Sequence, residues 1–372
     1  MESKHPLSAR VHVLGLVLLI TFVASDTALA QNQSFIKHLN TVTTISTTVP
    51  GNGDQNPYGV AQVPETKGKL IEGRFLISNF NNGANQQGIG TTIVQIAPDG
   101  TFSLFAQIDP TKISCPGGVG LTTALVALHS GFVIVGSLPT TDGTAATAGA
   151  GCLIVLNSIG NVVETFSGHH LNGPWDMTAV DGGPLAVLFV TNVLNGTVAA
   201  NGNVVNGGTV VRLLLSIPDG QSPQLLDSTI IASGFPERTD PAALVIGPTG
   251  VAFDGFTGTL FVADSLNNRI AAVPNALFRN DAAANGGQTI SEGKELNDPL
   301  GLVFAPNGNL LAANGNDGNI VEVDPGTGKQ DKKLVDNSGR PPKGAGALFG
   351  LIAVSDGVYF VDDATNTFNF FH

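Results

Sequence analysis

A repeated pattern of short strands and turns constrains the fold more than any other feature of this sequence. Its clearest copy is residues 260–273, LFVADSLNNRIAAV, in which two short apolar runs flank a segment rich in Asp, Ser and Asn. Side chains of these three types bond their own backbone and tolerate tight turns. Each run is therefore predicted to be a strand, and the polar segment the turn between them. A further apolar run at residues 250–253 adds a third strand upstream.

The same pattern returns along the whole chain. The units start at six positions, Gly59, Gly120, Asp176, Gly250, Gly301 and Gly350. A self-similar unit of about 40 to 50 residues that contains only short strands and turns is typical of a β-propeller, in which each four-stranded sheet buries its faces against its neighbours. We therefore predict an all-β fold, a six-bladed β-propeller of four-stranded antiparallel blades, over residues 31–372.

The last unit has only three predicted strands before His372. Residues 38–48, HLNTVTTISTT, are rich in Val and Thr and suit an edge strand. We expect this N-terminal strand to complete the sixth blade and close the ring, because closure removes an exposed sheet edge.

One stretch resembles a known repeat. VADSLNNRI, preceded by PTGVAFD, is similar to the NHL repeat, and the six units resemble the NHL and SMP-30/gluconolactonase-like group of six-bladed propellers. The likeness is strongest over residues 248–273 and extends to residues 298–323. It implies the propeller fold, but lyases, lactonases and binding modules all use this architecture.

The first 30 residues are typical of a secretory signal peptide. Lys4 and Arg10 precede an apolar run at residues 11–23, and Ala28 and Ala30 form a small-residue cleavage site. The apolar run is too short to span a membrane comfortably. We predict cleavage after Ala30 and a secreted or periplasmic protein without a membrane span.

The formal net charge of -12 excludes some partners. An acidic domain repels phosphate backbones, so nucleic acid and anionic membranes are not expected to bind. We expect a monomer that takes a small-molecule, glycan or protein ligand at the mouth of the central channel.

The chain has two cysteines, Cys115 and Cys152. In an oxidising compartment such a pair is predicted to form a disulfide, here within the second blade. A metal site is the weaker alternative, since the sequence lacks a CxxC spacing and a nearby His.

A polar residue is predicted at the end of the second strand of every blade. These crown residues are Asn79, Ser137, Asn192, Asp264, Asn314 and Asp362. Equivalent positions in a closed ring converge near its axis, and Asn and Asp oxygens suit calcium. The alternative is that these side chains only form turns by bonding their own backbone.

The family resemblance implies a metal held at this mouth by a Glu of the first blade together with Asn and Asp of later blades. Asn192 and Asp264 match the Asn and Asp, which makes calcium the candidate cofactor and Asp264 a candidate catalytic residue. The Glu has no counterpart, because the first loop reads NPYG at residues 56–59. Arg269 has a simpler interpretation as an ion-pair partner of an Asp.

A second candidate cluster enters the third blade. His170 could form a general-base pair with Asp176 or Asp264, and Trp175 could be a platform for an apolar or sugar ligand. The alternative is that Trp175 packs under a loop and that His170 points outward.

Three long loops, residues 81–90, 140–151 and 195–208, follow the second strand of the first three blades and are expected on the crown face. Residues 275–285 are the one predicted helical segment.

Two functions are consistent with these features of the sequence. The first is a binding module that uses the crown and its loops, with Asn79, Asn192, Asn314 and Asp362 as contacts beside Trp175 and Asp176. The alternative is a calcium-dependent hydrolase or lactonase.

Overall fold

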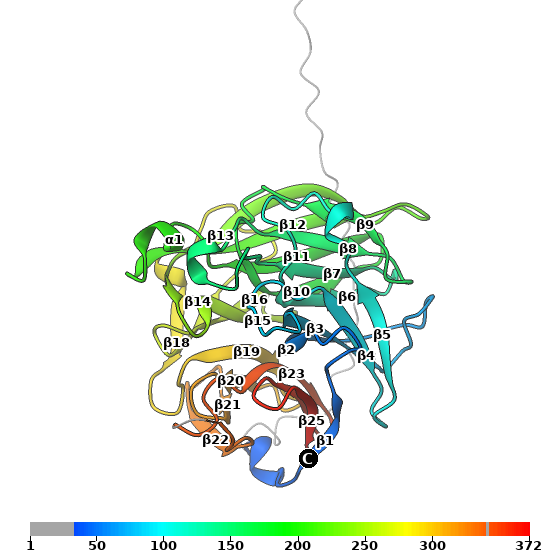
Figure 1. Ribbon diagram of the computed structural model, residues 1–372. Helices are drawn as coiled ribbons and strands as arrows, with labels where there is room; N and C mark the ends of the chain where they lie inside the picture. Colours follow the sequence, from blue (N-terminus) through cyan, green and yellow to red (C-terminus); the bar gives the residue numbers. More distant parts are fainter. Residues whose placement is uncertain (1–32, 340–341) are drawn as a thin grey trace, which may run out of the picture. The chain divides into compact units, whose positions relative to one another are not determined.

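The computed structural model describes residues 33–339 and 342–372, so the predicted signal peptide lies outside the described residues. The compact unit Ser34–His372 contains six antiparallel sheets (Figure 1). Each innermost strand packs against the innermost strands of the neighbouring sheets, and the first of them packs against the last. The predicted six-bladed β-propeller is confirmed.

Each blade takes consecutive strands from the chain, except at the closure. Blade 1 contains β2 (Gln55–Gln62), β3 (Phe75–Asn81), β4 (Thr92–Ile96) and β5 (Phe102–Gln107); blade 2 contains β6 (Leu121–Ala127), β7 (Val133–Ser137), β8 (Cys152–Leu156) and β9 (Val162–Phe166); blade 3 contains β10 (Pro174–Asp181), β11 (Leu185–Asn192), β12 (Val205–Ser216), β13 (Gln224–Asp240) and β14 (Leu244–Ile246). Blade 4 contains β15 (Pro248–Asp254), β16 (Thr259–Asp264), β17 (Arg269–Val273) and β18 (Gln288–Glu292); blade 5 contains β19 (Pro299–Phe304), β20 (Leu310–Asn314), β21 (Asn319–Val323) and β22 (Gln330–Leu334); blade 6 contains β23 (Leu348–Val354), β24 (Gly357–Asp362), β25 (Thr367–Phe371) and β1 (Val42–Thr47).

The N-terminal strand closes the ring as predicted. β1 pairs antiparallel with β25, from Val42 opposite Phe371 to Thr47 opposite Thr367. Glu322 anchors the segment before β1, because its carboxylate accepts hydrogen bonds from the Phe35 and Ile36 N–H groups at 2.9 and 3.0 Å. Blade 6 therefore contains both ends of the described fold.

Blade 3 departs from the predicted four strands. Its β12 and β13 run for 12 and 17 residues, and β13 turns back into the added strand β14. Helix α1 (Thr197–Ala200) lies in the loop before β12. The helix predicted at residues 275–285 was wrong: this segment forms turns and the short 3-10 helix η4 (Ala284–Gly286). Positive φ values of 54° at both Asn275 and Asn285 are incompatible with a continuous α-helix.

Glycines let the innermost strands approach one another closely. In blades 1, 4 and 5 the first part of these strands contains Pro, one variable residue and Gly. A Cβ atom on Gly250, Gly301 or Gly350 would collide with a carbonyl oxygen of the next blade, on Leu300, Phe349 and Tyr58 respectively. The tight ring therefore requires a residue without a side chain at these positions.

A disulfide joins Cys115, in the loop before β6, to Cys152, the first residue of β8, with Cα atoms 5.5 Å apart. Both are in the blade for which the bridge was predicted. The two cysteines are 37 positions apart.

Replacing both cysteines by alanine should lower the free energy of unfolding by about 3 to 4 kcal/mol, because the bridge restricts the unfolded chain across this loop. Urea denaturation of the wild type, the double variant and the reduced wild type measures the effect. Equal stability of the oxidised wild type and the double variant would contradict it.

Candidate functional site

The crown residues are buried, and several of them form hydrogen bonds with neighbouring loops and side chains. Asn79, Ser137, Asn192, Asp264 and Asn314 are completely buried. Asn192 accepts a hydrogen bond from the Asn172 N–H at 3.0 Å, and Asn314 accepts one from the Asn297 N–H at 3.1 Å. These contacts fasten the end of the second strand to the loop that enters the innermost strand. The turn interpretation expected bonds to the backbone of the same turn, whereas these bonds join the strand end to a different loop.

Asp264 forms a buried ion pair with Arg269, as the simpler interpretation of Arg269 predicted. Its Oδ2 accepts a hydrogen bond from Arg269 Nε at 2.6 Å and another from Asn267 Nδ2 at 2.9 Å. The guanidinium also donates to Thr289 Oγ1 and to the Asn285 carbonyl. A calcium ion at Asp264 would face this guanidinium at close range, and the Asn192 oxygen is already bonded. Asp264 Oδ1 is buried without a partner in the described residues. The guanidinium beside Oδ2 and the bonded Asn192 oxygen nevertheless do not suit a calcium ion, so we derive no chemistry from a metal here.

Melting temperatures with and without calcium test the metal prediction directly. If Asp264 only pairs with Arg269, calcium should shift the wild type and Asp264→Asn by the same amount. A calcium-induced rise confined to the wild type would contradict this interpretation. Arg269→Met should destabilise the protein by about 3 to 5 kcal/mol, because it leaves the Asp264 carboxylate buried without a partner.

An apolar plug fills the crown end of the axis. It consists of the variable residue of four innermost strands and one neighbouring aromatic residue: Tyr58, Trp175, Leu300, Phe349 and Phe80. Trp175 is 2% exposed, with its ring centroid 5.6 Å from that of Tyr58. Its surface is therefore occupied by packing, which leaves little of the ring to serve as a ligand platform.

The long loops lie on the same face as the plug, as expected. Ala145 and Ala148 of one loop and Val198 of α1 pack against the plug cluster. Gln87 of the first loop donates a hydrogen bond to the Ala242 carbonyl at 2.9 Å, next to β14. Together these loops cap the end of the propeller where the sequence predicted an open mouth.

His170 is not joined to the proposed acidic partners. It is exposed, has a φ of 66° and sits in the turn between Gly168 and Leu171. Across the described part of the chain, its ring forms no hydrogen bond or ion pair with Asp176 or Asp264. The structure thus separates the members of the predicted general-base pair.

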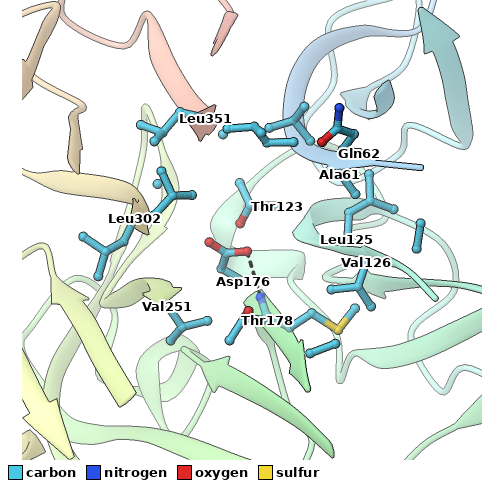
Figure 2. A pocket seen from close by; sticks show the side chains of 18 of the residues that line it. Ala61, Gln62, Thr123, Leu125, Val126, Asp176, Thr178, Val251, Leu302 and Leu351 are labelled. Atoms are coloured by element: carbon cyan, nitrogen blue, oxygen red, sulfur yellow. Dashed lines mark hydrogen bonds between the residues drawn. The ribbon is translucent and has the colours of Figure 1, made fainter. Parts of the chain in front are cut away.

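A cavity of about 410 Å³ occupies the other half of the axis. All six innermost strands line it, and it extends to the ends of β6 and β10, on the face opposite the cap. Its wall is mainly aliphatic, with Thr123, Thr178 and Gln62 among the polar side chains (Figure 2). Small-molecule sites have this character, since a largely apolar wall with a few polar groups supplies both affinity and orientation.

Asp176 projects into this cavity from the position that glycine holds in other blades. Pro174 pairs with Asn192 as Pro248 pairs with Asp264, so Asp176 corresponds to Gly250. Figure 2 shows its carboxyl group among Thr123, Leu302 and Leu351. Blades 1, 4, 5 and 6 have glycine at this position, and blade 2 has Thr123, whose Oγ1 donates a hydrogen bond to the Trp175 carbonyl. Blade 3 is therefore the blade that places a carboxyl group there.

The Asp176 carboxyl group has few partners. Its Oδ1 accepts a hydrogen bond from the Met177 N–H at 2.7 Å, whereas no group in the described residues bonds Oδ2. Burial raises the pKa of Asp176 well above that of an ordinary aspartate, and the Met177 hydrogen bond offsets this only in part. The surroundings thus favour the neutral acid, which can donate a hydrogen bond into the cavity.

This raised pKa makes the protein less stable as the pH rises. Above the pKa of about 3.9 of an aspartate in an unfolded chain, the folded state holds a proton that the unfolded state has lost. The stability gained from the neutral carboxyl group is full below that pH and disappears as the pH rises through the folded pKa. Over that interval the loss is about 1.4 kcal/mol per pH unit.

Asp176→Asn removes this loss, so the variant should become progressively more stable than the wild type between pH 4 and neutrality, on the order of 1 kcal/mol or more. Urea denaturation at several pH values gives the difference. Glu237→Gln is the matched control, because burial also raises the pKa of Glu237, to about 8, away from the cavity. A stability difference between Asp176→Asn and the wild type that does not change with pH would contradict the assignment.

Two further titratable residues line the outer end of the cavity. His129 follows β6, and Asp181 ends β10. The two side chains contact each other, with His129 Nδ1 3.1 Å from Asp181 Oδ2. Sequence reasoning missed this pair because the residues are 52 positions apart and share no motif.

Other buried acids surround the plug. Burial and the neighbouring Asp240 raise the pKa of Asp298 to about 6, and burial and Asp362 raise that of Asp363 to about 7. They lie at the capped end, away from the axial cavity. Within residues 33–339 and 342–372, no group of three or more His, Cys, Asp or Glu side chains is arranged to hold a metal ion.

No protein-family model and no curated protein sequence matches the chain. Solved structures match its fold. A gluconolactonase from Xanthomonas campestris is 14% identical, with a TM-score of 0.50 over 89% of this chain and 88% of that chain. The chain shares its six-bladed propeller fold. The PQQ-bound aldose sugar dehydrogenase from Streptomyces coelicolor is 15% identical over 89% and 97% of the chains, with a TM-score of 0.52. A luciferin-regenerating enzyme is 10% identical over 89% and 94%, also with a TM-score of 0.52.

Proposed function

We propose that this protein is a binding module that holds a small, mainly apolar molecule in the axial cavity. The observation that carries the proposal is Asp176, a carboxyl group at the glycine position of the repeat, facing an apolar cavity of about 410 Å³. One oxygen of this carboxyl group accepts the Met177 N–H and the other faces the cavity without a bond to the described residues. Holding a carboxyl group in an apolar wall costs stability, so its presence is better explained by a ligand than by the fold.

The chemistry of the cavity indicates the kind of molecule. The neutral Asp176 acid donates from Oδ2, because Oδ1 already accepts the Met177 N–H. Its complement is a hydrogen-bond acceptor such as a carbonyl or ether oxygen. The aliphatic wall, including Leu125, Leu302 and Leu351, complements an apolar body. The ligand is thus a neutral molecule with an acceptor at its inner end.

This proposal keeps the predicted binding module but moves its ligand to the face opposite the crown. The alternative, a calcium-dependent hydrolase or lactonase, is not favoured by any contact of Asn192 or Asp264. We also propose that the protein is exported, which the predicted leader and the Cys115–Cys152 disulfide support. None of the helices in the described residues has the length and apolar character that crossing a bilayer requires.

Titration with prodan, a naphthyl ketone whose fluorescence reports the polarity around it, tests the proposal. The wild type should bind prodan with a blue shift in emission. Asp176→Leu should weaken binding about tenfold, because it removes the donor but keeps an apolar wall. Thr178→Trp should abolish binding, because the indole would occupy the cavity.

Thr165→Trp is the matched control. Thr165 lies on β9, the outermost strand of blade 2, so a tryptophan there leaves the cavity unchanged. Equal prodan affinity in the wild type and in Thr178→Trp, or no binding by the wild type, would overturn the proposal.

A further inference from the structure

We propose that His129 and Asp181 form a general-base pair at the outer end of the axial cavity, which hydrolyses a linear ester bond of the molecule held there. The inference rests on the proposed function, because the cavity must hold the substrate. It adds a reaction, and it locates that reaction on the face opposite the crown.

Asp181 fixes the His129 ring through two contacts to one oxygen. Its Oδ2 accepts the His129 N–H at 2.7 Å and lies 3.1 Å from Nδ1. Its other oxygen accepts the Gly183 N–H at 2.9 Å, which holds the carboxylate in place. Because a carboxylate only accepts hydrogen bonds, Nδ1 carries the proton of the neutral ring, and Nε2 has the free lone pair.

The Asp181 side chain is held in place, whereas the His129 side chain is accessible to a substrate. The Asp181 side chain is 11% exposed, whereas that of His129 is 61% exposed. His129 lines the axial cavity and also a neighbouring hollow of about 320 Å³, whose wall includes Lys67, Phe132 and Ile217. A substrate can therefore place its acyl part in the cavity, its leaving group in the hollow and the bond between them beside His129.

Strand β10 sets the length of that substrate. Asp176 and Asp181 are five positions apart on this strand, which corresponds to about 16 Å. A molecule whose inner end reaches Asp176 therefore presents its ester bond to His129 only if its acyl part is long. A medium-chain acyl group fits this spacing, and an acetyl group does not.

The reaction needs only water. His129 Nε2 takes a proton from a water molecule as the water oxygen attacks the carbonyl carbon. The tetrahedral intermediate then collapses, the carbon–oxygen bond to the leaving group breaks, and the imidazolium returns its proton to the leaving oxygen. One water is consumed, an acid and an alcohol form, and no electrons are exchanged. The Asp181 carboxylate stabilises the transient imidazolium.

The charged groups around His129 are few. Asp181 faces its ring, and Lys67 donates a hydrogen bond to its carbonyl at 2.7 Å while pairing with Glu65 at 3.4 Å.

Hydrolysis of two esters tests the inference: p-nitrophenyl 9-oxodecanoate, a decanoate whose terminal ketone can accept a hydrogen bond from Asp176, and p-nitrophenyl acetate. The wild type should prefer decanoate, and His129→Gln should lower kcat/KM for decanoate about 100-fold. Asp181→Asn should lower it about tenfold, since the ring loses its orienting carboxylate. His170→Gln, at another exposed histidine, should leave it unchanged.

Prodan titration of His129→Gln separates the two proposals and checks the fold. If His129→Gln binds prodan and hydrolyses decanoate at the rate of the wild type, the catalytic assignment is overturned and the binding module stays in place. A wild type that does not prefer decanoate over acetate would also overturn it. If the wild type does not bind prodan, the proposed function itself is overturned.

Discussion

The close approach of the innermost strands is the constraint on which the rest of the structure depends. At Gly250, Gly301 and Gly350 the backbone of one blade lies directly against a carbonyl oxygen of the next. A side chain at any of these positions would force the blades apart, so the sequence repeats glycine there. The residue before each glycine then falls on the axis, where Leu300 and Phe349 join Tyr58 in the plug.

This arrangement makes the two ends of the propeller different. The crown end is closed twice, by the aromatic plug and by the loops that cross over it. The other end keeps an axial cavity that every blade lines. A ligand thus has access to the axis from the open end, where it meets Asp176, the carboxyl group that replaces glycine in blade 3. All six blades form the wall of the cavity, and Asp176 of blade 3 provides its carboxyl contact.

The sequence was sufficient to predict the ring, because a period of short strands and turns has few other solutions. It also predicted the N-terminal strand of blade 6 and the disulfide partner of Cys115. It could not predict where the crown side chains point. That direction depends on the surroundings of each strand end: Asp264 lies opposite Arg269 in the pairing of β16 with β17 and bonds to it, whereas Asn192 bonds to the loop at Asn172.

The candidate site was visible in part. Asp176 was predicted as a ligand contact and as a partner of His170, but its neighbour Trp175 and the preceding histidines suggested a site on the other face. The contact between His129 and Asp181 joins the β6–β7 hairpin of blade 2 to the β10–β11 hairpin of blade 3. Only the pairing of the whole ring brings such residues together, so no local pattern could predict it.

The central claim is that the ligand enters the open end of the axis and reaches Asp176. Diffraction from crystals soaked with a brominated naphthyl ketone tests it most directly, because the anomalous signal of bromine locates the probe without an assumption about its pose. The account predicts a bromine peak inside the cavity between Asp176 and His129, and its loss in Thr178→Trp crystals. A peak under the loops at the crown end, or a peak that persists in Thr178→Trp, would contradict it.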